Sequence, residues 1–509
     1  FCLYNFLFLF IGESRVMIIS YLSQDYGRFG YHSSGQSCLL ERCDNKHLNI
    51  ALFPWLAFGH ILPNFELAKL LAQKGHTITL ISTPQNINRL PLIPQHLKQL
   101  INLLRLPILP NNKANLPENA ESTTDVPTNK LPYLKMAYDG LEESLAQFLK
   151  TSPPDWILYD FSADWLPLIA NSLNFPCAFF NVCPAWTVCF FNTPAARLGS
   201  TAVIRTTPED YLGPPNWVPF QSNIGLGLHE VNKMFEGYTD KEIGLTTGFD
   251  LDKAISNCDL FVVRSCTELE SEWLNLLGEI YKKPVVPVGI IPPSCQIRVA
   301  DKEEEHPEWL RIKSWLDKQE QGSVIYIAFG AEIKISQEDL TEVALGLELS
   351  VFPFFWALRK QKDSYIDLPD GFEERISGRG VVCRDWVPQL QILAHVSVGS
   401  YLTHCGSSSV IEGLHFGRVL VMLPYLLDQA LYARVLGEKK LGIEIPRNEQ
   451  DGTFTRNSVP KSLRLAIVDE EGSIFREKAK EMGLAFSDKD RHQRYIENFI
   501  AYLINHKPT

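Results

Sequence analysis

Apolar runs and amphipathic segments alternate along the chain from about residue 47. In the first half the apolar runs are LNIALFPW, TITLIST, INLLRLPIL, DWILYDF, CAFFNV, CDLFVVRS and PVVPVG, which are typical of buried strands. Between them, residues 61–71, 131–150, 270–282 and a stretch beginning at Trp165 carry apolar residues at helical spacing. Strands and helices that alternate in this way predict a parallel sheet covered by helices on both faces.

The same alternation restarts after a break. Pro292, Pro293 and the charged run 301–308 interrupt the pattern in the manner of an interdomain linker, although a surface loop is the alternative. The runs SVIYIAFG, FPFFWALR, GVVCRDW, GSYLTHCG and RVLVMLP then follow, with helical segments between them. We therefore expect an α/β protein with two facing, doubly wound, Rossmann-like domains, which bind ligands at the carboxyl ends of their strands. The expected parts are an N-terminal domain at 46–292, a linker at 293–310, a C-terminal domain at 311–485, and a last helix at 486–509 that packs back on the N-terminal domain.

Composition and charge exclude or disfavour several classes of protein. The chain has 509 residues, of which 45% are hydrophobic and 21% charged, so it is unlike disordered or collagen-like chains. The net charge of −11 disfavours a nucleic-acid partner, because such a partner requires clustered Lys and Arg. Eleven cysteines without a Cys-x-x-Cys pair argue against a disulfide framework or a zinc ribbon, and for a reducing compartment.

The first 45 residues do not predict a membrane anchor. The apolar run FCLYNFLFLFI is too short to span a bilayer, and it has neither a basic flank nor a clear cleavage site; a targeting role is the alternative. The chain begins with Phe and its first Met is Met17, which is typical of a fragment or a misplaced start. We expect residues 1–45 to be a disordered or non-native extension of a soluble, cytoplasmic protein.

Several familiar motifs are missing from the sequence. No G-x-G-x-x-G follows a strand, and no P-loop, G-x-S-x-G elbow or H-E-x-x-H occurs. Two Asp-x-Asp triplets, Asp250/Asp252 and Asp488/Asp490, stand next to predicted helices, where Asp is a favourable cap or first-turn residue. We therefore expect no metal site and no cofactor.

The segment 386–429 carries the most specific chemistry in the chain. The strand GSYLTH runs into Cys405-Gly406 and a predicted helix that begins at 407–409, and the free N–H groups of such a helix start can bind a diphosphate without metal. His404 can add a donor, and Glu412, one turn into the helix, can accept hydrogen bonds from two ribose hydroxyls. Trp386 offers a flat face for a base. The alternatives are a capping box made by Ser409 and Glu412, and a Trp386 that belongs to the core.

This segment resembles the signature of the plant secondary-product UDP-glycosyltransferases (glycosyltransferase family 1), which have the GT-B fold. The matching positions are Trp386, Pro388, Gln389, Leu393, His395, Gly399, Thr403, His404, Cys405, Gly406, Ser409, Glu412, Gly417, Pro424, Asp428 and Gln429. The resemblance extends from about His47 to the C-terminus. Sequence segments outside 386–429, such as RSCTELESEWL, are similar to those of the branch that contains UDP-rhamnose and soyasaponin rhamnosyltransferases.

The resemblance implies that the two halves of the chain bind different substrates. The C-terminal half is expected to bind the UDP-sugar and the N-terminal half the acceptor. Trp386 and Gln389 would hold the uridine, His404 and the helix start the diphosphate, Glu412 the ribose, and Asp428 with Gln429 the donor sugar. The full expected donor site is Trp386, Val387, Gln389, His404, Gly406, Ser408, Ser409, Glu412, Asp428 and Gln429.

The chain departs from the family pattern at three positions. Ser407 and Ser408 stand where the family usually has Trp-Asn, and Ala331 stands where it usually has a Ser that bonds the diphosphate. Loss of these groups weakens donor binding by about 1 kcal/mol per neutral hydrogen bond. Because Ser408 can replace the Asn in part, the departures predict reduced or altered donor recognition rather than inactivity.

The N-terminal half supplies a candidate base. Gly59-His60 follows the first strand and Asp160 ends the strand DWILYD, so both fall at the edge that binds ligands in a doubly wound sheet. An imidazole can remove a hydroxyl proton, and a carboxylate can orient the imidazole and stabilise its charged form. A lone His in such a turn is more often structural, but the resemblance places His60 and Asp160 on the family's catalytic pair. It implies displacement in one step, with inversion and without a covalent intermediate.

The acceptor side is less specific. The aromatic cluster of Phe179, Phe180, Trp186, Phe190 and Phe191 is best read as core packing, and Phe180, Trp186 and Phe190 are the candidates to line an apolar acceptor pocket. The sequence thus predicts a monomeric, inverting UDP-dependent transferase that moves a hexosyl group, rhamnose or glucose, to a hydroxyl of a small lipophilic plant metabolite, such as a flavonoid or triterpenoid glycoside. The alternative is a non-catalytic protein, derived from such enzymes, that binds a UDP-sugar or a small molecule.

Overall fold

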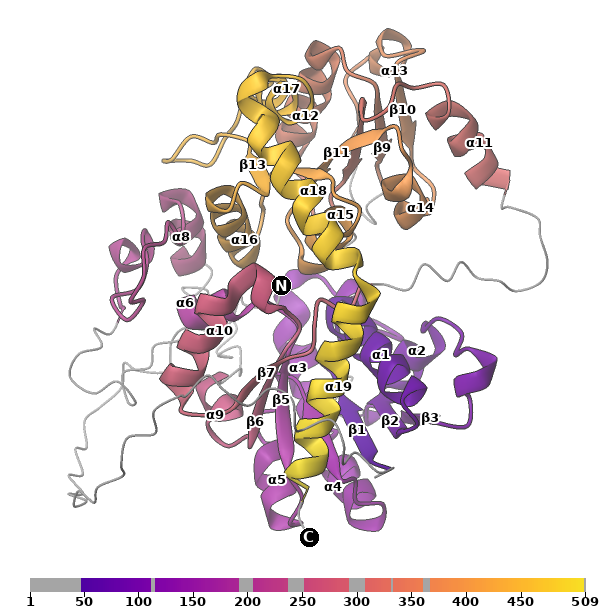
Figure 1. Ribbon diagram of the computed structural model, residues 1–509, viewed down its shortest axis with the longest axis vertical. Helices are drawn as coiled ribbons and strands as arrows, with labels where there is room; N and C mark the ends of the chain where they lie inside the picture. Colours follow the sequence, from indigo (N-terminus) through magenta and orange to yellow (C-terminus); the bar gives the residue numbers. More distant parts are fainter. Residues whose placement is uncertain are drawn as a thin grey trace.

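Two parallel sheets, one above the other in Figure 1, organise the protein. The computed structural model describes residues 47–110, 115–191, 205–236, 251–292, 307–330, 333–359 and 367–507. The expected N-terminal extension, Ala331, Asp250 and residues 293–306 of the expected linker lie outside the described residues. The predicted α/β architecture with two Rossmann-like sheets is confirmed.

The N-terminal sheet has seven strands in the order β3-β2-β1-β4-β5-β6-β7. All its pairings are parallel, and Ile50 in the centre of the sheet pairs with Ile78 on one side and with Trp156 on the other. The order reverses between β1 and β4, which makes the carboxyl edge of these two strands the switch point where such sheets bind ligands. The strands are β1 (Asn49–Phe53), β2 (Thr77–Ser82), β3 (Ile101–Arg105), β4 (Trp156–Tyr159), β5 (Cys177–Asn181), β6 (Leu260–Val263) and β7 (Val285–Pro287).

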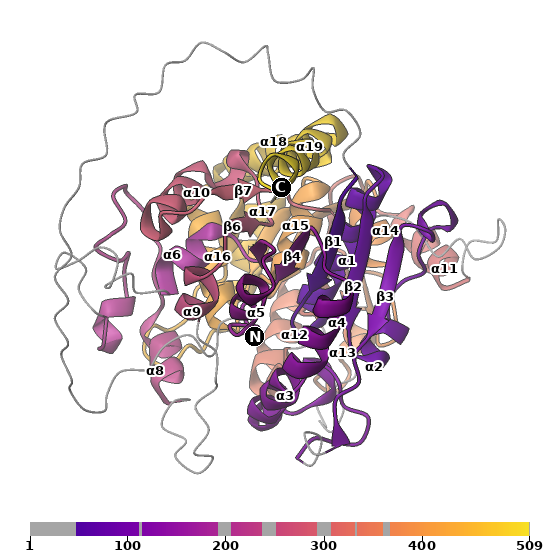
Figure 2. The same cartoon turned by 90° about the horizontal axis from the view of Figure 1, so that it is seen from below.

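Helices cover both faces of this sheet (Figure 2). The segment 131–150, predicted as one helix, is two helices, because the chain turns at Gly140 and Leu141. The first helix begins at Phe58, earlier than predicted, since the Ala57 carbonyl accepts the N–H of Ile61 at 2.9 Å; His60 therefore lies in its first turn. The helices are α1 (Phe58–Gln73), α2 (Pro84–Asn88), α3 (Leu131–Asp139), α4 (Glu142–Thr151), α5 (Leu166–Ser172), α6 (Ala185–Phe191), α8 (Leu228–Glu236), α9 (Leu251–Ser256) and α10 (Thr267–Tyr281).

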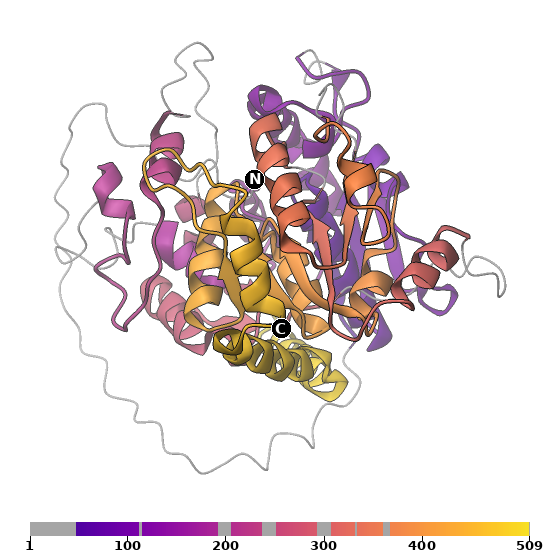
Figure 3. The ribbon, with the colours of Figure 1, turned by 90° about the horizontal axis from the view of Figure 1, so that it is seen from above.

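The C-terminal sheet has six parallel strands in the order β10-β9-β8-β11-β12-β13. It lies in the half of the molecule that is nearer the viewer in Figure 3. Residues 307–310, assigned to the linker from the sequence, are helical, because α11 begins at Pro307. The strands are β8 (Val324–Ala328), β9 (Phe354–Ala357), β10 (Gly380–Cys383), β11 (Val398–Thr403), β12 (Val419–Met422) and β13 (Gly442–Glu444). The helices are α11 (Pro307–Leu316), α12 (Gln337–Ser350), α13 (Phe372–Arg375), α14 (Gln389–Ala394), α15 (Ser407–His415), α16 (Leu427–Glu438), α17 (Ser458–Ile467) and α18 (Ser473–Ser487).

The last helix, α19 (Lys489–Asn505), runs from the C-terminal sheet down along the N-terminal one (Figure 1). The indole N–H of Trp156 on β4 donates to the Leu503 carbonyl at 3.0 Å, and Phe499 is buried in the N-terminal core. Asp488 caps this helix by accepting the N–H of Arg491 at 3.0 Å, as predicted for the second Asp-x-Asp triplet. The C-terminal end of the chain thus ties the two sheets together.

Two further observations concern the cysteines and the helix hydropathy of the described residues. All seven cysteines among them are buried and free of disulfides. Within the same residues, no helix combines the length and the hydropathy needed to cross a membrane.

Candidate active site

His60 and Asp160 form a buried pair at the carboxyl edge of the N-terminal sheet. His60 lies in the first turn of α1, after β1, and Asp160 directly follows β4, the neighbouring strand. The Nδ1 atom of His60 lies 2.6 Å from Oδ2 of Asp160, and each residue exposes only 2% of its surface. The two residues that the sequence predicted to act together are therefore in direct contact.

Backbone groups hold the carboxylate of Asp160 in place. Its Oδ2 atom also accepts the N–H of Trp55 at 3.2 Å, and its Oδ1 atom accepts the N–H of Phe161 at 2.8 Å. An acceptor held in this way favours the histidine tautomer that carries its proton on Nδ1, which leaves the lone pair on Nε2. Such an imidazole can accept a proton at Nε2, and the carboxylate can stabilise the resulting positive charge.

The turn between β11 and α15 forms the second part of the site. Gly406 is the N-cap of α15, and Cys405 before it has a left-handed φ of 65°. This conformation is uncommon for a residue with a side chain and occurs often at functional turns. Because the first N–H groups of an α-helix lack intrahelical acceptors, the start of α15 offers donors and a positive dipole end to an anion.

His404 is enclosed between Gly406 of this turn and Gly330, which follows β8. A Cβ atom at Gly330 would lie 2.8 Å from its Cε1, and one at Gly406 would lie 2.5 Å from its Nε2, so both positions require glycine. Burial lowers the pKa of His404 well below its ordinary value, which keeps the ring neutral near pH 7. Its Nδ1 atom is buried and has no hydrogen-bond partner among the described residues. The ring is thus a neutral hydrogen-bonding group beside the helix start.

Three residues predicted to hold the nucleoside lie on adjoining elements. The amide of Gln389, the first residue of α14, donates to Oε2 of Glu412 on α15 at 2.6 Å and accepts from the Tyr326 hydroxyl at 3.0 Å. Burial raises the pKa of Glu412. Trp386 exposes 63% of its surface, so it does not belong to the core, whereas its neighbour Val387 is buried. An exposed indole next to a part-buried amide–carboxylate pair is an arrangement suited to a base and a ribose.

Asp428 and Gln429 lie in the first turn of α16, and both are buried. The Gln429 side-chain oxygen accepts the N–H groups of Tyr425 and Leu426, at 3.0 and 3.1 Å. These bonds orient the amide and close the turn between β12 and α16. The pair is therefore part of a hydrogen-bonded strand–helix connection at the carboxyl edge of the C-terminal sheet.

The two carboxyl edges meet at the start of α15. The Ser407 hydroxyl donates to the Val182 carbonyl, after β5, at 3.3 Å. Arg264, directly after β6, donates from Nη1 to the Ser408 hydroxyl at 3.4 Å. Ser409 behind them is 9% exposed. The structure thus brings the His60 edge of one sheet against the candidate diphosphate site of the other.

Two residues that support this arrangement, Arg264 at the contact and Glu270 within the N-terminal half, were not predicted from the sequence. Arg264 was visible as the first charged residue after the apolar run CDLFVV, at a carboxyl strand end, and that signal went unused. Glu270 is buried in α10 and accepts the N–H groups of Ala185 and Trp186 at 2.9 and 3.2 Å, which caps α6 from a distant part of the chain. Burial raises its pKa to about 7. No local pattern distinguishes Glu270 from the other acidic residues of its helix.

The three acceptor candidates are buried in the hydrophobic core. Phe180 exposes 1% of its surface and packs on the sheet face covered by α1 and α19. Trp186 and Phe190 are fully buried on the other face, where Trp186 lies edge-on to Tyr432 of α16. In this structure the burial favours the packing interpretation, which the sequence also offered for this cluster.

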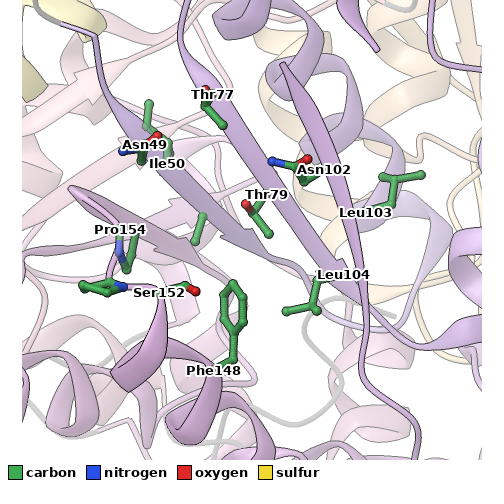
Figure 4. A pocket seen from close by; sticks show the side chains of 12 residues that line it. Asn49, Ile50, Thr77, Thr79, Asn102, Leu103, Leu104, Phe148, Ser152 and Pro154 are labelled. Atoms are coloured by element: carbon green, nitrogen blue, oxygen red, sulfur yellow. The ribbon is translucent and has the colours of Figure 1, made fainter. Parts of the chain in front are cut away.

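Two cavities of similar size lie away from His60. One, of about 410 Å³, is lined by Asn49, Thr77 and Asn102 on the N-terminal strands and by Phe148 and Ser152 (Figure 4). It includes the first residues of β1 and β2 and so opens toward the amino ends of these strands, opposite to the ligand edge. The other, of about 430 Å³, lies between α8 and the turn before α16. Neither cavity contains His60 or Asp160.

Comparisons with known proteins agree with this geometry. A model of the family described as UDP-glucoronosyl and UDP-glucosyl transferase matches residues 287–488. The protein named soyasaponin III rhamnosyltransferase from Glycine max is 53% identical over 91% of this chain and 96% of its own length. The chain belongs to the UDP-glycosyltransferase family. UDP-glycosyltransferase 91A1 from Arabidopsis thaliana is 44% identical over 91% of this chain and 98% of its own length.

Solved structures extend the comparison to the fold of this UDP-glycosyltransferase. The crystal structure of Glycyrrhiza uralensis UGT73P12 complexed with glycyrrhetinic acid 3-O-monoglucuronide superposes with a TM-score of 0.73, at 20% identity over 90% of this chain and 96% of that chain. The GT-B fold is therefore confirmed, as are the predicted family and the predicted class of enzyme, a glycosyltransferase that uses a UDP-sugar.

Proposed function

We propose that this UDP-glycosyltransferase moves a hexosyl group, rhamnose or glucose, to a hydroxyl of a small lipophilic plant glycoside with inversion of the anomeric centre. The observation that carries the proposal is the buried pair of His60 and Asp160, with 2.6 Å between Nδ1 and Oδ2, at the edge that meets the start of α15. The pair supplies a base, and the helix start supplies a site for the diphosphate that leaves.

In the proposed step, Nε2 of His60 removes the proton of the acceptor hydroxyl as that oxygen attacks the anomeric carbon. The new carbon–oxygen bond forms while the bond from the anomeric carbon to the UDP oxygen breaks on the opposite face. UDP leaves with the electron pair, and the proton stays on His60, whose positive charge Asp160 stabilises. A single displacement inverts the configuration, and no covalent intermediate is needed.

The proposed donor site follows from the positions described above. The exposed face of Trp386 stacks on the uracil, with Val387 beneath it and Gln389 beside it. Glu412 accepts from the ribose hydroxyls, a role that its part-buried contact with the Gln389 amide supports. Gly406, Ser408, Ser409 and His404 surround the diphosphate, and Asp428 with Gln429 faces the sugar. We propose no metal and no cofactor for this site.

The nature of the sugar and of the acceptor is proposed from relatives. The Glycine max relative is named a soyasaponin rhamnosyltransferase, which supports rhamnose as the sugar and a triterpenoid glycoside as the acceptor. A flavonoid glycoside is the second acceptor class that the sequence resemblance implies. The monomeric state and the cytoplasmic location remain predictions from the sequence.

A transfer assay with purified protein tests the proposal. UDP-rhamnose and UDP-glucose are each incubated with a panel of triterpenoid and flavonoid glycosides, and UDP release, product mass and anomeric configuration are measured. We expect an inverted glycoside from at least one pair. His60→Ala serves as the control, with UDP binding retained and transfer lost. Measurable UDP binding without transfer for every pair would contradict the proposal and favour the non-catalytic binding protein.

A further inference from the structure

A buried arginine of the N-terminal half reaches the candidate diphosphate site. Arg264 directly follows β6 and exposes 4% of its surface. Its Nε atom donates to the Ile290 carbonyl at 2.9 Å, and its Nη2 atom donates to the Ile291 carbonyl at 3.1 Å. The third nitrogen, Nη1, lies 3.4 Å from the hydroxyl of Ser408, in the first turn of α15. The guanidinium is therefore held on one side and directed at the helix start on the other.

The charge of Arg264 is not balanced where it lies. Among the described residues, no carboxylate lies within ion-pair distance of its guanidinium. Burial lowers the pKa of Arg264, and the more distant Glu412 and Glu66 oppose this effect only in part. The positive end of the α15 dipole adds a charge of the same sign. A buried cation without a counter-charge is costly even when it is hydrogen-bonded, and an anion at this point would reduce the cost.

The backbone on both sides of this contact is strained. Ile291, whose carbonyl accepts from Arg264, has a φ of 45°, and Cys405, just before α15, has a φ of 65°. A left-handed conformation is a genuine outlier for a β-branched residue such as Ile291. Strain of this kind persists where the surrounding structure requires it, and it gathers at sites that hold ligands. Here it aims one carbonyl at the guanidinium and turns the chain into α15.

We propose that Arg264 is a donor-binding residue: its guanidinium, presented by the acceptor half, binds the diphosphate of the UDP-sugar together with the start of α15. This inference rests on the proposed donor site. A guanidinium offers paired N–H groups that match phosphate oxygens, and such charge-assisted bonds are stronger than neutral ones. Arg264 then stabilises the negative charge that grows on UDP as it leaves, and it makes donor binding draw the two halves together.

The alternative role is purely structural, a clamp between β6 and the segment 290–291. Arg379 offers a matched control, because its guanidinium also binds backbone carbonyls, those of Leu347, Glu348 and Phe352, within the C-terminal half. The experiment compares Arg264→Gln and Arg379→Gln with the wild type, using calorimetric titration of UDP and of uridine and a thermal melt of each protein.

We expect Arg264→Gln to weaken UDP binding by about tenfold to a hundredfold and uridine binding by less than about twofold, because uridine lacks the phosphates. Arg379→Gln should leave the affinities for both ligands unchanged. Arg264→Lys, which keeps a charge but not the fork of donors, should show an intermediate loss for UDP, and it serves as the second variant if Arg264→Gln does not fold.

Equal loss of UDP and uridine affinity in Arg264→Gln, or no loss of either, would overturn the assignment. An unchanged UDP affinity in Arg264→Lys would also overturn the assignment. A wild-type protein that binds no UDP would instead refute the proposed donor site, so the two failures are distinguishable.

Discussion

Replacing Asp160 by Asn tests the catalytic pair more sharply than removing His60. The carboxylate accepts three hydrogen bonds, from His60 at 2.6 Å, from the Trp55 N–H at 3.2 Å and from the Phe161 N–H at 2.8 Å. An asparagine has one acceptor oxygen. If that oxygen stays on Phe161, its NH₂ group faces Nδ1 of His60, which must then accept, so the proton moves to Nε2 and the base is lost.

The other orientation of the amide has a different cost. With the oxygen toward His60, the NH₂ group opposes the N–H of Phe161, which leaves a buried donor unsatisfied at about 1–3 kcal/mol. The base keeps its tautomer but loses the charge that stabilises its protonated form. In both orientations we expect kcat to fall by about a hundredfold to ten-thousandfold, the range of a positioned general base. His60→Ala should lose roughly a hundredfold or more.

The assay is the initial rate of UDP release at saturating substrates, alongside the calorimetric affinity for UDP. UDP affinity should stay nearly unchanged in Asp160→Asn, because the pair faces the acceptor. Asp164→Asn is the matched control: this buried carboxylate lies in the same loop but pairs with Lys253 at 2.6 Å, so its loss should affect Tm more than kcat. A wild-type kcat in Asp160→Asn, or a loss of UDP affinity as large as the loss of rate, would refute the reasoning.

Trp386→Ala should weaken UDP binding by about one to two orders of magnitude, since base stacking contributes roughly 1–3 kcal/mol. Its Tm should change little, because the indole is 63% exposed. Calorimetry that shows an unchanged UDP affinity would contradict the stacking role. Burial raises the pKa of Glu270 from 4.5 to about 7, so the folded state binds more protons than the unfolded one between these values. The unfolding free energy should therefore fall by roughly 3 kcal/mol from this group as pH rises from about 4.5 to 7, and denaturant melts of Glu270→Gln should lack that slope; identical pH profiles would disprove it. Transfer activity should survive EDTA, because backbone amides and His404 are proposed to bind the diphosphate, and a rate restored only by magnesium or manganese would overturn this view.

The sequence by itself determined the architecture and the family of this protein. Strands buried on both faces are continuous apolar runs, so their alternation with helical segments indicates two parallel sheets without any tertiary information. Parallel strands share one carboxyl edge, which is why His60 and Asp160 could be assigned to one site although a hundred residues separate them. The segment 386–429 was specific because a helix start, a base platform and a ribose acceptor occur there at fixed local spacings. The short strand β13 (Gly442–Glu444) was missed because its residues, Gly-Ile-Glu, form no continuous apolar run, unlike those of the equally short β7.

Only the tertiary structure decided which side chains complete the site. Side-chain direction alternates along a strand, so Phe179 and Phe180 of β5 pack on opposite faces, and no count of aromatics reveals which of them approaches a ligand. Glu270 caps α6 and Arg264 meets Ser408 through contacts between segments far apart in the chain. Such contacts depend on how the two sheets are docked. The raised pKa of Glu270 and the unbalanced charge of Arg264 both result from burial by segments that are far apart in the chain. Such properties of the folded surroundings leave no trace in the local sequence.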